Sequence, residues 1–199
     1  MSEHFAYGEK EIEYLKKKDK KLGALIDEIG KIERKVHDDL FSALVDNVIC
    51  QQISTKAADS IHKRLQEMMD ITAENLDAAS EEEIQKCGVS FRKASYIKNI
   101  ARAVVTKEVD QEKMKDMSDS EIIDILVKIK GIGVWTAEMI LIFVFGREDI
   151  VSYGDLVIRR NMMQLYGLKE LPKEKFQRYA KRYSPYGTLA SLYLWAMTD

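Results

Sequence analysis

Apolar residues recur at the three- and four-residue spacing of α-helices along almost the whole chain. In 40–50, Leu40, Leu44 and Val48 form one apolar stripe, which is typical of a buried helix. Similar patterns predict helices over 7–18, 19–29, 54–69, 80–87, 91–107, 118–126, 134–145 and 155–166, and two more that begin near 172 and 185. Only 150–153 is expected to be briefly extended, and no alternation lasts long enough for a sheet. We therefore predict an all-α fold.

Local signals mark several ends of these helices. Ser80 with Glu83, and Ser118 with Glu121, fit the capping box that begins a helix. Gly30 is placed to end the second helix. No repeat, low-complexity tract or linker divides the chain. We expect a single unit over 1–199 made of two helical lobes with a cleft between them, approximately 35–115 and 1–34 plus 116–199.

Composition excludes several classes of protein. The 199 residues are 46% hydrophobic and 32% charged, with a net charge of −2, as in a soluble globular protein. Two cysteines cannot form a disulfide framework or ligate a four-thiolate iron–sulfur cluster, and three histidines show no metal-site spacing with them. The longest apolar stretch, 139–145, is too short to span a membrane, and no signal peptide is evident. We expect a cytoplasmic protein, whose overall charge does not by itself suggest nucleic acid.

The sharpest local signal is a glycine-punctuated hairpin at 126–137, within a helix pair at about 119–145. Gly131 and Gly133 permit a tight turn and leave no side chain between the backbone and a phosphate. Amide groups at the start of the following helix, at Val134 and Thr136, add a positive dipole end. These four residues are candidates for binding a DNA backbone. Glycine spacing alone is equally compatible with a turn that binds nothing.

The hairpin resembles the helix-hairpin-helix of the helix-hairpin-helix–Gly/Pro–Asp DNA glycosylase superfamily. The family pattern is LxxIxGIGxxTA, then an apolar helix, a Gly/Pro-rich loop and a catalytic aspartate. Here Asp155 follows Gly131 by 24 residues. The segments 50–58, which contains Gln-Gln-Ile-Ser, 91–97 and 182–186 are similar to the alkylation-repair branch, the 3-methyladenine DNA glycosylase II type. The resemblance extends from about residue 7 to the C-terminus.

The resemblance implies that Asp155 is the catalytic residue. A carboxylate can stabilise the positive charge that develops on the sugar, and can orient or deprotonate the attacking water. Without the resemblance, Asp155 would be interpreted as a helix N-cap, and the two roles are compatible. Trp135 stands where related bifunctional lyases have the lysine that forms a Schiff base, which implies a monofunctional enzyme that uses water.

The resemblance also implies a base pocket and a DNA wedge. Pocket residues would be Trp135 and Tyr186, with Met139 and Tyr153 beside them. Aromatic rings attract positively charged methylpurines by cation–π interaction. Gln52, with its neighbour Ile53, matches the residue that fills the gap left by a flipped base. Without the resemblance, Trp135 would be core packing and 51–53 a polar turn between helices.

Three residues depart from the branch, and two basic stretches are ambiguous. Gly187 stands where arginine is common, Tyr183 where tryptophan is common, and Gly154 where some relatives have a second acid. The stretches 91–107 and 173–182 are rich in lysine and arginine. Each either follows DNA phosphates or is a solvated helix face.

The combined prediction is a monofunctional glycosylase that removes 3-methyladenine and 7-methylguanine from double-stranded DNA in base excision repair. We expect a monomer without an organic cofactor or iron–sulfur cluster, associated with the nucleoid if bacterial. Carbonyls of Ile129 and Gly131 are candidate ligands for a structural Na⁺ or K⁺ ion. The alternatives are a glycosylase for uracil or hypoxanthine, a non-catalytic helix-hairpin-helix DNA-binding protein, and a helical scaffold that does not touch DNA.

Overall fold

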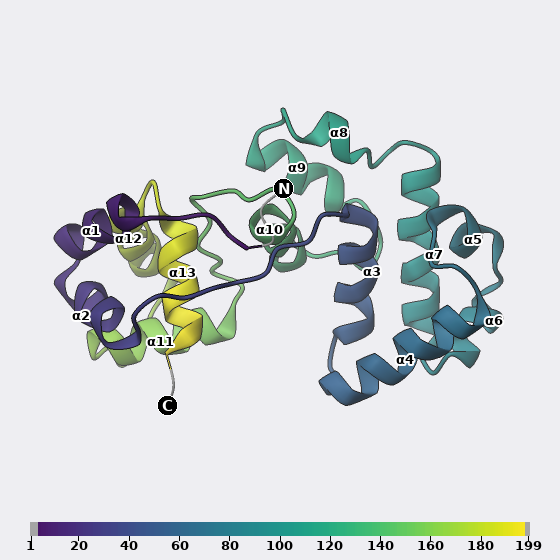
Figure 1. The fold of residues 1–199 in the computed structure, drawn as a ribbon, viewed down its shortest axis with the longest axis horizontal. Helices are drawn as coiled ribbons and strands as arrows, with labels where there is room; N and C mark the ends of the chain where they lie inside the picture. The colour runs from purple at the N-terminus through teal and green to yellow at the C-terminus, as the bar shows by residue number, and fades with distance from the viewer. Residues whose placement is uncertain (1–3, 198–199) are drawn as a thin grey trace. The chain divides into compact units, whose positions relative to one another are not determined.

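The structure is a computed structural model that describes residues 4–197, and it is all-α as predicted (Figure 1). Over these residues the chain forms helices and a single isolated bridge between His4 and Lys35, with no strand. The helices are α1 Glu9–Lys18, α2 Lys20–Ile29, α3 Leu40–Cys50, α4 Thr55–Met68, α5 Ala73–Ala78, α6 Glu81–Lys86, α7 Phe91–Val105, α8 Gln111–Met114, α9 Asp119–Leu126, α10 Val134–Phe143, α11 Leu156–Tyr166, α12 Lys173–Tyr183 and α13 Gly187–Ala196.

The helices group into two compact units. Unit 1 comprises the described residues up to His37 and from Leu141 onward, and unit 2 comprises Asp38–Ile140. The second boundary therefore lies inside α10, whereas the sequence led us to expect it near residue 115. This difference in the boundary arises from tertiary packing. Gly131 of the hairpin lies against the ring of Tyr96 on α7, so the hairpin belongs with α7 in unit 2.

Unit 2 is organised around α7, which packs against α3, α5 and α6. The Ser90 side chain caps this helix by accepting a hydrogen bond from the Lys93 N–H at 3.3 Å. Ile97 and Ile100 on its inner face are completely buried. The apolar stripe of α3, from Leu40 to Val48, is buried as predicted.

Unit 1 is organised around α13, whose residues from Gly187 to Leu194 are all buried. Tyr183, where the related branch often has tryptophan, is also completely buried. Its hydroxyl forms a 2.7 Å hydrogen bond with the hydroxyl of Tyr166. Burial raises the pKa of both phenols. Tyrosine suits this position because its polar end has a partner inside the unit.

Local signals in the sequence placed most helix ends correctly. Both predicted capping boxes are present, at Ser80 with Glu83 and at Ser118 with Glu121. Gly30 ends α2 with a positive φ of 76°. The short helices α5 and α8 were not predicted, because each has too few residues for an apolar period to show. The segment 150–153 forms no strand.

Candidate functional site

The glycine hairpin joins α9 to α10 inside unit 2. Two turn hydrogen bonds close it, from the Ile129 N–H to the Leu126 carbonyl at 3.1 Å and from the Ile132 N–H to the Ile129 carbonyl at 3.0 Å. The side chains of Ile129 and Ile132 are buried. These apolar anchors fix the turn and leave its glycines at the surface.

The two glycines serve different purposes. Gly131 has a φ of 109°, and a Cβ atom there would lie 2.6 Å from Cδ2 and 2.8 Å from Cβ of Tyr96. The fold itself therefore requires glycine at 131. Gly133 has an ordinary φ, and a Cβ atom there would meet nothing within 4 Å. The missing side chain at 133 leaves open surface at the start of α10, where a ligand can approach the backbone.

The start of α10 has the features of an anion-binding helix terminus. The Gly133 carbonyl accepts the hydrogen bond of the Ala137 N–H at 3.0 Å, so Gly133 is the residue that precedes the first turn. Val134 is 54% exposed, whereas Thr136 is only 3% exposed. Amide groups of the first helical turn point away from the helix body and carry partial positive charge. Of the four predicted backbone-binding residues, Thr136 offers the least surface.

Unit 2 brings the predicted pocket residue Trp135 and the predicted wedge residue Gln52 to one cavity. The cavity has a volume of about 410 Å³. Its lining comprises Asn47, Cys50, Gln51, Gln52, Arg92, Lys93 and Trp135. Trp135 is 40% exposed, which is unusual for so large an apolar ring. Sequence spacing alone did not predict that Trp135 and Gln52 line the same cavity.

The turn between α3 and α4 holds Gln52 in a strained conformation. Gln51 has φ −55° and ψ 124°, and Gln52 has φ 58°. These angles, with a long hydrogen bond of 3.5 Å from the Ile53 N–H to the Cys50 carbonyl, fit a type II turn. Glycine is the favoured residue at the third position of such a turn. A glutamine kept there against backbone preference points to a role for its side chain.

Lys93 holds this turn in place. Its Nζ atom donates to the carbonyl oxygens of Ile49 at 2.8 Å and Gln51 at 2.5 Å, at the C-terminal end of α3. A cation is favourable at this end of a helix. Burial lowers the pKa of the Lys93 ammonium group. Lys93 therefore positions the turn, a role that its place in a basic stretch did not suggest.

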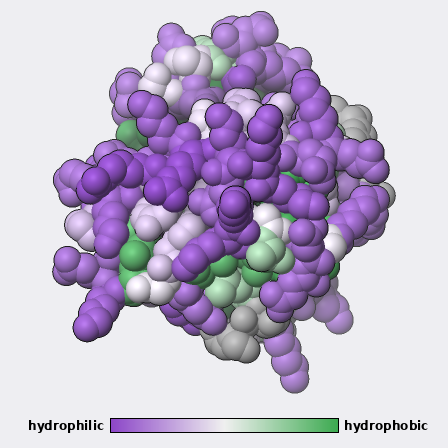
Figure 2. Space-filling model, turned by 90° about the vertical axis from the view of Figure 1, so that its left-hand side faces the viewer, coloured by the Kyte–Doolittle hydropathy of each residue, from purple (hydrophilic) through white to green (hydrophobic). Residues whose placement is uncertain are grey.

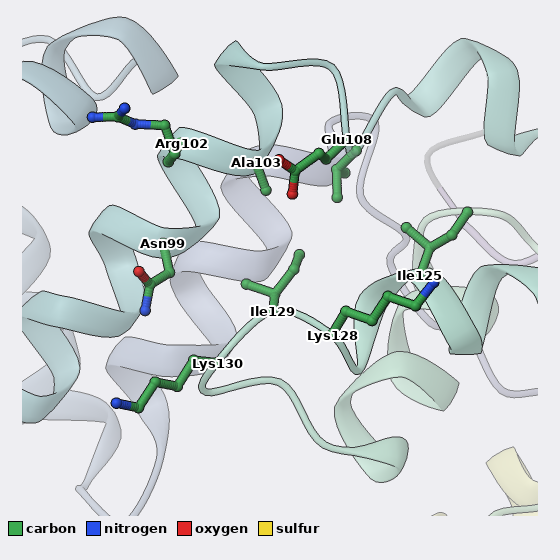
Figure 3. A pocket seen from close by; sticks show the side chains of 9 residues that line it. Asn99, Arg102, Ala103, Glu108, Ile125, Lys128, Ile129 and Lys130 are labelled. Atoms are coloured by element: carbon green, nitrogen blue, oxygen red, sulfur yellow. The ribbon is translucent and has the colours of Figure 1, made fainter.

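A second cavity of unit 2, with a volume of about 440 Å³, lies between α7 and the α9 side of the hairpin. Ile129 lies near its centre, while the charged ends of Arg102 and Lys130 point away from that centre (Figure 3). Ile129 and, from the basic stretch 91–107, Arg102 are the residues singled out in the sequence that line this cavity. It is therefore separate from the cavity that contains Trp135.

Asp155 lies in unit 1 and begins α11. It is 6% exposed, and its Oδ1 atom accepts a hydrogen bond from the Ile158 N–H at 2.9 Å. The predicted N-cap is thus confirmed. The body of α11 is fixed by the buried Ile158 and by Asn161, whose Nδ2 atom donates to the Leu194 carbonyl at 2.7 Å. The helix holds the carboxylate at its positive end, in a fixed orientation.

The loop that leads to Asp155 is bonded to α13. The Thr188 hydroxyl donates to the Arg147 carbonyl at 2.6 Å and accepts from the Ile150 N–H at 3.0 Å. The Ser191 hydroxyl donates to the Ile150 carbonyl at 2.9 Å. Because Thr188, Ser191 and Ile150 are buried, the loop cannot shift without breaking several hydrogen bonds.

Asp149 also bonds the loop before Asp155 to the start of α13, and its position explains why residue 187 is glycine and not the arginine common in the related branch. Its carboxylate accepts from the Ser184 hydroxyl at 2.6 Å and from the Gly187 N–H at 3.0 Å, at the start of α13. A Cβ atom on Gly187 would lie 2.7 Å from Asp149 Oδ1 and 2.8 Å from Val151 Cγ2. The arginine that the related branch often has at this position would not fit here.

The remaining pocket candidates are divided between the units. Tyr186, in unit 1, meets the ring of Tyr14 edge-on at 5.2 Å, and the Tyr14 hydroxyl donates to the Ser184 carbonyl at 2.8 Å. Tyr153, also in unit 1, lies 5.0 Å beneath the guanidinium group of Arg159. Met139, in unit 2, is buried in α10.

The contacts of Asp149 and Tyr14, and the place of Asn47 in the lining of the Trp135 cavity, were not predicted from the sequence. Asp149 and Tyr14 act through partners distant in the sequence. Asn47 interrupts the apolar pattern of α3 and could have been noticed as a polar residue on a buried helix. Among residues 4–197, no three His, Cys, Asp or Glu side chains are grouped to hold a metal ion. No helix in this range is long and apolar enough to cross a membrane.

Comparison with known proteins identifies the family of the chain. Residues 45–185 match the family described as HhH-GPD superfamily base excision DNA repair protein. DNA-3-methyladenine glycosylase 1 of Schizosaccharomyces pombe is 33% identical over 161 residues, which cover 78% of this chain and 71% of the relative. DNA-3-methyladenine glycosylase of Saccharomyces cerevisiae is 38% identical over 150 residues, 69% of this chain and 50% of the relative.

Solved structures extend the similarity over nearly the whole chain. The DNA-3-methyladenine glycosidase of Bacillus halodurans superposes with a TM-score of 0.87 at 33% identity, covering 98% of this chain and 92% of that protein. The Schizosaccharomyces pombe 3-methyladenine DNA glycosylase, solved in complex with abasic DNA, superposes with a TM-score of 0.82 at 30% identity, covering 94% and 95%. The chain belongs to the HhH-GPD superfamily of base excision DNA repair proteins.

Proposed function

We propose that the protein is a monofunctional DNA glycosylase that hydrolyses the N-glycosidic bond of alkylated purines, chiefly 3-methyladenine and 7-methylguanine. The observation that carries this proposal is the Asp155 carboxylate. It is buried and fixed at the start of α11, after the hairpin, in a chain whose relatives are named 3-methyladenine glycosylases.

Asp155 supplies the charge that the reaction needs. Loss of the base leaves positive charge on the sugar ring, and a fixed carboxylate stabilises that charge without reorganising during the reaction. The same carboxylate orients the water that attacks the sugar. Because Oδ1 accepts the Ile158 N–H at 2.9 Å, the group has a defined direction before DNA binds.

Trp135 favours alkylated purines and a hydrolytic route. Its exposed ring offers cation–π attraction to a positively charged methylpurine, worth about 0.5–2 kcal/mol. The family resemblance assigns Tyr186, as a second aromatic ring, and Met139 and Tyr153 to the base pocket as well. An indole cannot form a Schiff base, so water is the nucleophile.

Four further features belong to the proposal. The protein acts as a monomer on double-stranded DNA that contains a damaged base, and Gln52 with Ile53 fills the gap after base flipping. A Na⁺ or K⁺ ion on the Ile129 and Gly131 carbonyls would support the hairpin, without any organic cofactor. We place this activity in the cytoplasm, at the nucleoid in a bacterial source.

Replacing Asp155 with asparagine is expected to lower base release about a hundredfold or more. Asparagine is also a good N-cap, so the variant should fold and bind damaged DNA as the wild type does. Chromatography of bases released from methylated DNA measures activity, and titration with a labelled duplex measures binding. Near-normal release of 7-methylguanine by Asp155→Asn would remove Asp155 from the catalytic role.

Replacing Gly133 with alanine is expected to weaken DNA binding roughly tenfold or more, because an obstructed charged hydrogen bond costs about 1.5–3 kcal/mol. The added Cβ meets no protein atom, so the fold should lose at most about 1 kcal/mol through poorer capping. Gly133→Ser restores the cap but keeps the obstruction, and should bind as weakly as Gly133→Ala. Normal binding by both variants would contradict a phosphate contact at this turn.

Replacing Gln52 with glycine is expected to stabilise the fold by about 0.5–1 kcal/mol, because glycine relieves the left-handed strain. The same change should slow base release at least several-fold, since the wedge is lost. Lys107→Gly is a matched control, because Lys107 is the other described non-glycine residue with positive φ, at 63°. Urea unfolding and single-turnover base release measure the two effects. Full activity in Gln52→Gly would show that the side chain is not the wedge.

A further inference from the structure

A basic face on unit 1 has no role in the site described above. It is formed by the end of α1, the start of α2 and the end of α12. Its members are six exposed cations, Lys17, Lys18, Lys20, Lys21, Lys181 and Arg182. The two segments that contain them, 16–21 and 173–182, hold ten cations and two acids in a chain whose net charge is −2. Positive charge is therefore strongly concentrated in these two segments.

Buried Asp19 assembles this basic face. Its Oδ1 atom accepts from the Lys21 and Leu22 N–H groups and so caps α2. Its Oδ2 atom accepts from the Tyr166 hydroxyl at 2.9 Å and lies 3.5 Å from Nη1 of Arg182. One carboxylate thus ties the turn between α1 and α2 to the ends of α11 and α12.

Aromatic rings lie beneath the cations of the basic face. Tyr166 and Tyr179 stack with their centroids 4.1 Å apart. Nζ of Lys21 lies 6.0 Å from the Tyr166 centroid, and the guanidinium carbon of Arg182 lies 4.6 Å from that of Tyr179. Figure 2, which faces the side of the molecule where α1, α2 and α12 lie, shows a surface dominated by hydrophilic side chains. Cations held over rings present their charge outward on a rigid base.

Helix stability does not explain all of these lysines. Lys17 and Lys18 stand in the last turn of α1, where a cation is favourable. Lys20 and Lys21 stand in the first turn of α2, which contains no acidic residue. Cations at this end oppose the helix dipole and cost stability. Their placement therefore points to a ligand outside the chain.

In the other basic stretch, 91–107, three of the cations bond to partners within unit 2. Lys93 donates to carbonyls of α3 and the following turn, and Lys98 donates to the carbonyls of Asp77 and Ala79. Arg102 pairs with the Asp77 carboxylate at 2.6 Å. Of the two stretches that the sequence left ambiguous, only the one at 173–182 extends into a larger exposed cluster.

We propose that the basic face is a second DNA-binding surface, which binds backbone phosphates of duplex DNA without reading the bases. This proposal rests on the proposed function, since it assumes that DNA is the substrate. Lysine and arginine displace condensed counterions when they neutralise phosphates, which makes such binding strongly dependent on salt. The rings beneath the cations favour a flat, ordered surface over a flexible basic tail.

The test compares Lys20→Ala/Lys21→Ala with wild type on an undamaged duplex, over a range of KCl concentrations. We expect about tenfold weaker binding at low salt, and a slope of log affinity against log salt that is smaller by about 1 to 2. The same double variant should melt close to the wild-type temperature, because loss of the Lys21 contact with Tyr166 offsets removal of two cations from the positive end of α2. A merely structural role for these lysines would instead lower the melting temperature.

Lys86→Ala/Lys113→Ala is the charge-matched control, since it removes two exposed lysines from unit 2. This control should change neither the affinity nor the slope. Equal binding curves for the two double variants would overturn the proposal, and would leave an acidic protein as the class of partner that the basic face fits. Wild-type base release from methylated DNA is measured in parallel. Its absence would refute the proposed function, whereas the binding comparison bears on the basic face alone.

Discussion

The hydrogen bond from the Ile158 N–H to the Asp155 carboxylate is the constraint on which the proposed chemistry depends. It places a negative charge at the positive end of α11, where the helix dipole favours it. Neighbouring hydrogen bonds fix the position of α11. Asn161 donates to the Leu194 carbonyl of α13, and the loop before Asp155 bonds to Thr188 and Ser191. A carboxylate held in this way needs little rearrangement when charge develops on a nearby sugar.

In the proposed function, unit 2 binds DNA phosphates through backbone amides more than through charged side chains. Gly131 is required by its close approach to Tyr96, while Gly133 leaves open surface at the start of α10. A hairpin that binds phosphate through amides adds no positive charge to the composition. This explains how a protein with a net charge of −2 is suited to DNA. Net charge is a poor guide here, because the cations that matter are concentrated on one face of unit 1.

The parts of the fold that could be predicted from sequence are those that short-range interactions determine. Both capping boxes and the N-cap at Asp155 involve residues within one helical turn, so the sequence displays them directly. The pairing of Asp149 with Gly187 could not be predicted in this way, because 38 residues separate them. The boundary at Ile140 depends likewise on packing of the hairpin against α7.

The candidate site likewise combines features that the sequence reveals with features that depend on tertiary contacts. The family resemblance implied roles for Asp155, Trp135 and Gln52, but the strained turn at Gln52 and the two carbonyls held by Lys93 appear only in three dimensions. Lys93 looked like one cation among several in a basic stretch. Its burial against the end of α3 reflects a tertiary contact that a single sequence does not reveal.

In the proposed mechanism, water rather than an amine of the protein displaces the damaged base. Incubation of the protein with methylated duplex DNA and sodium borohydride tests it directly, because borohydride reduces a Schiff base to a stable covalent adduct. Because Trp135 stands at the position that a lyase gives to lysine, the expected products are free methylpurine and an abasic strand, with no adduct of protein and DNA. A trapped adduct that forms in proportion to the released base would contradict it.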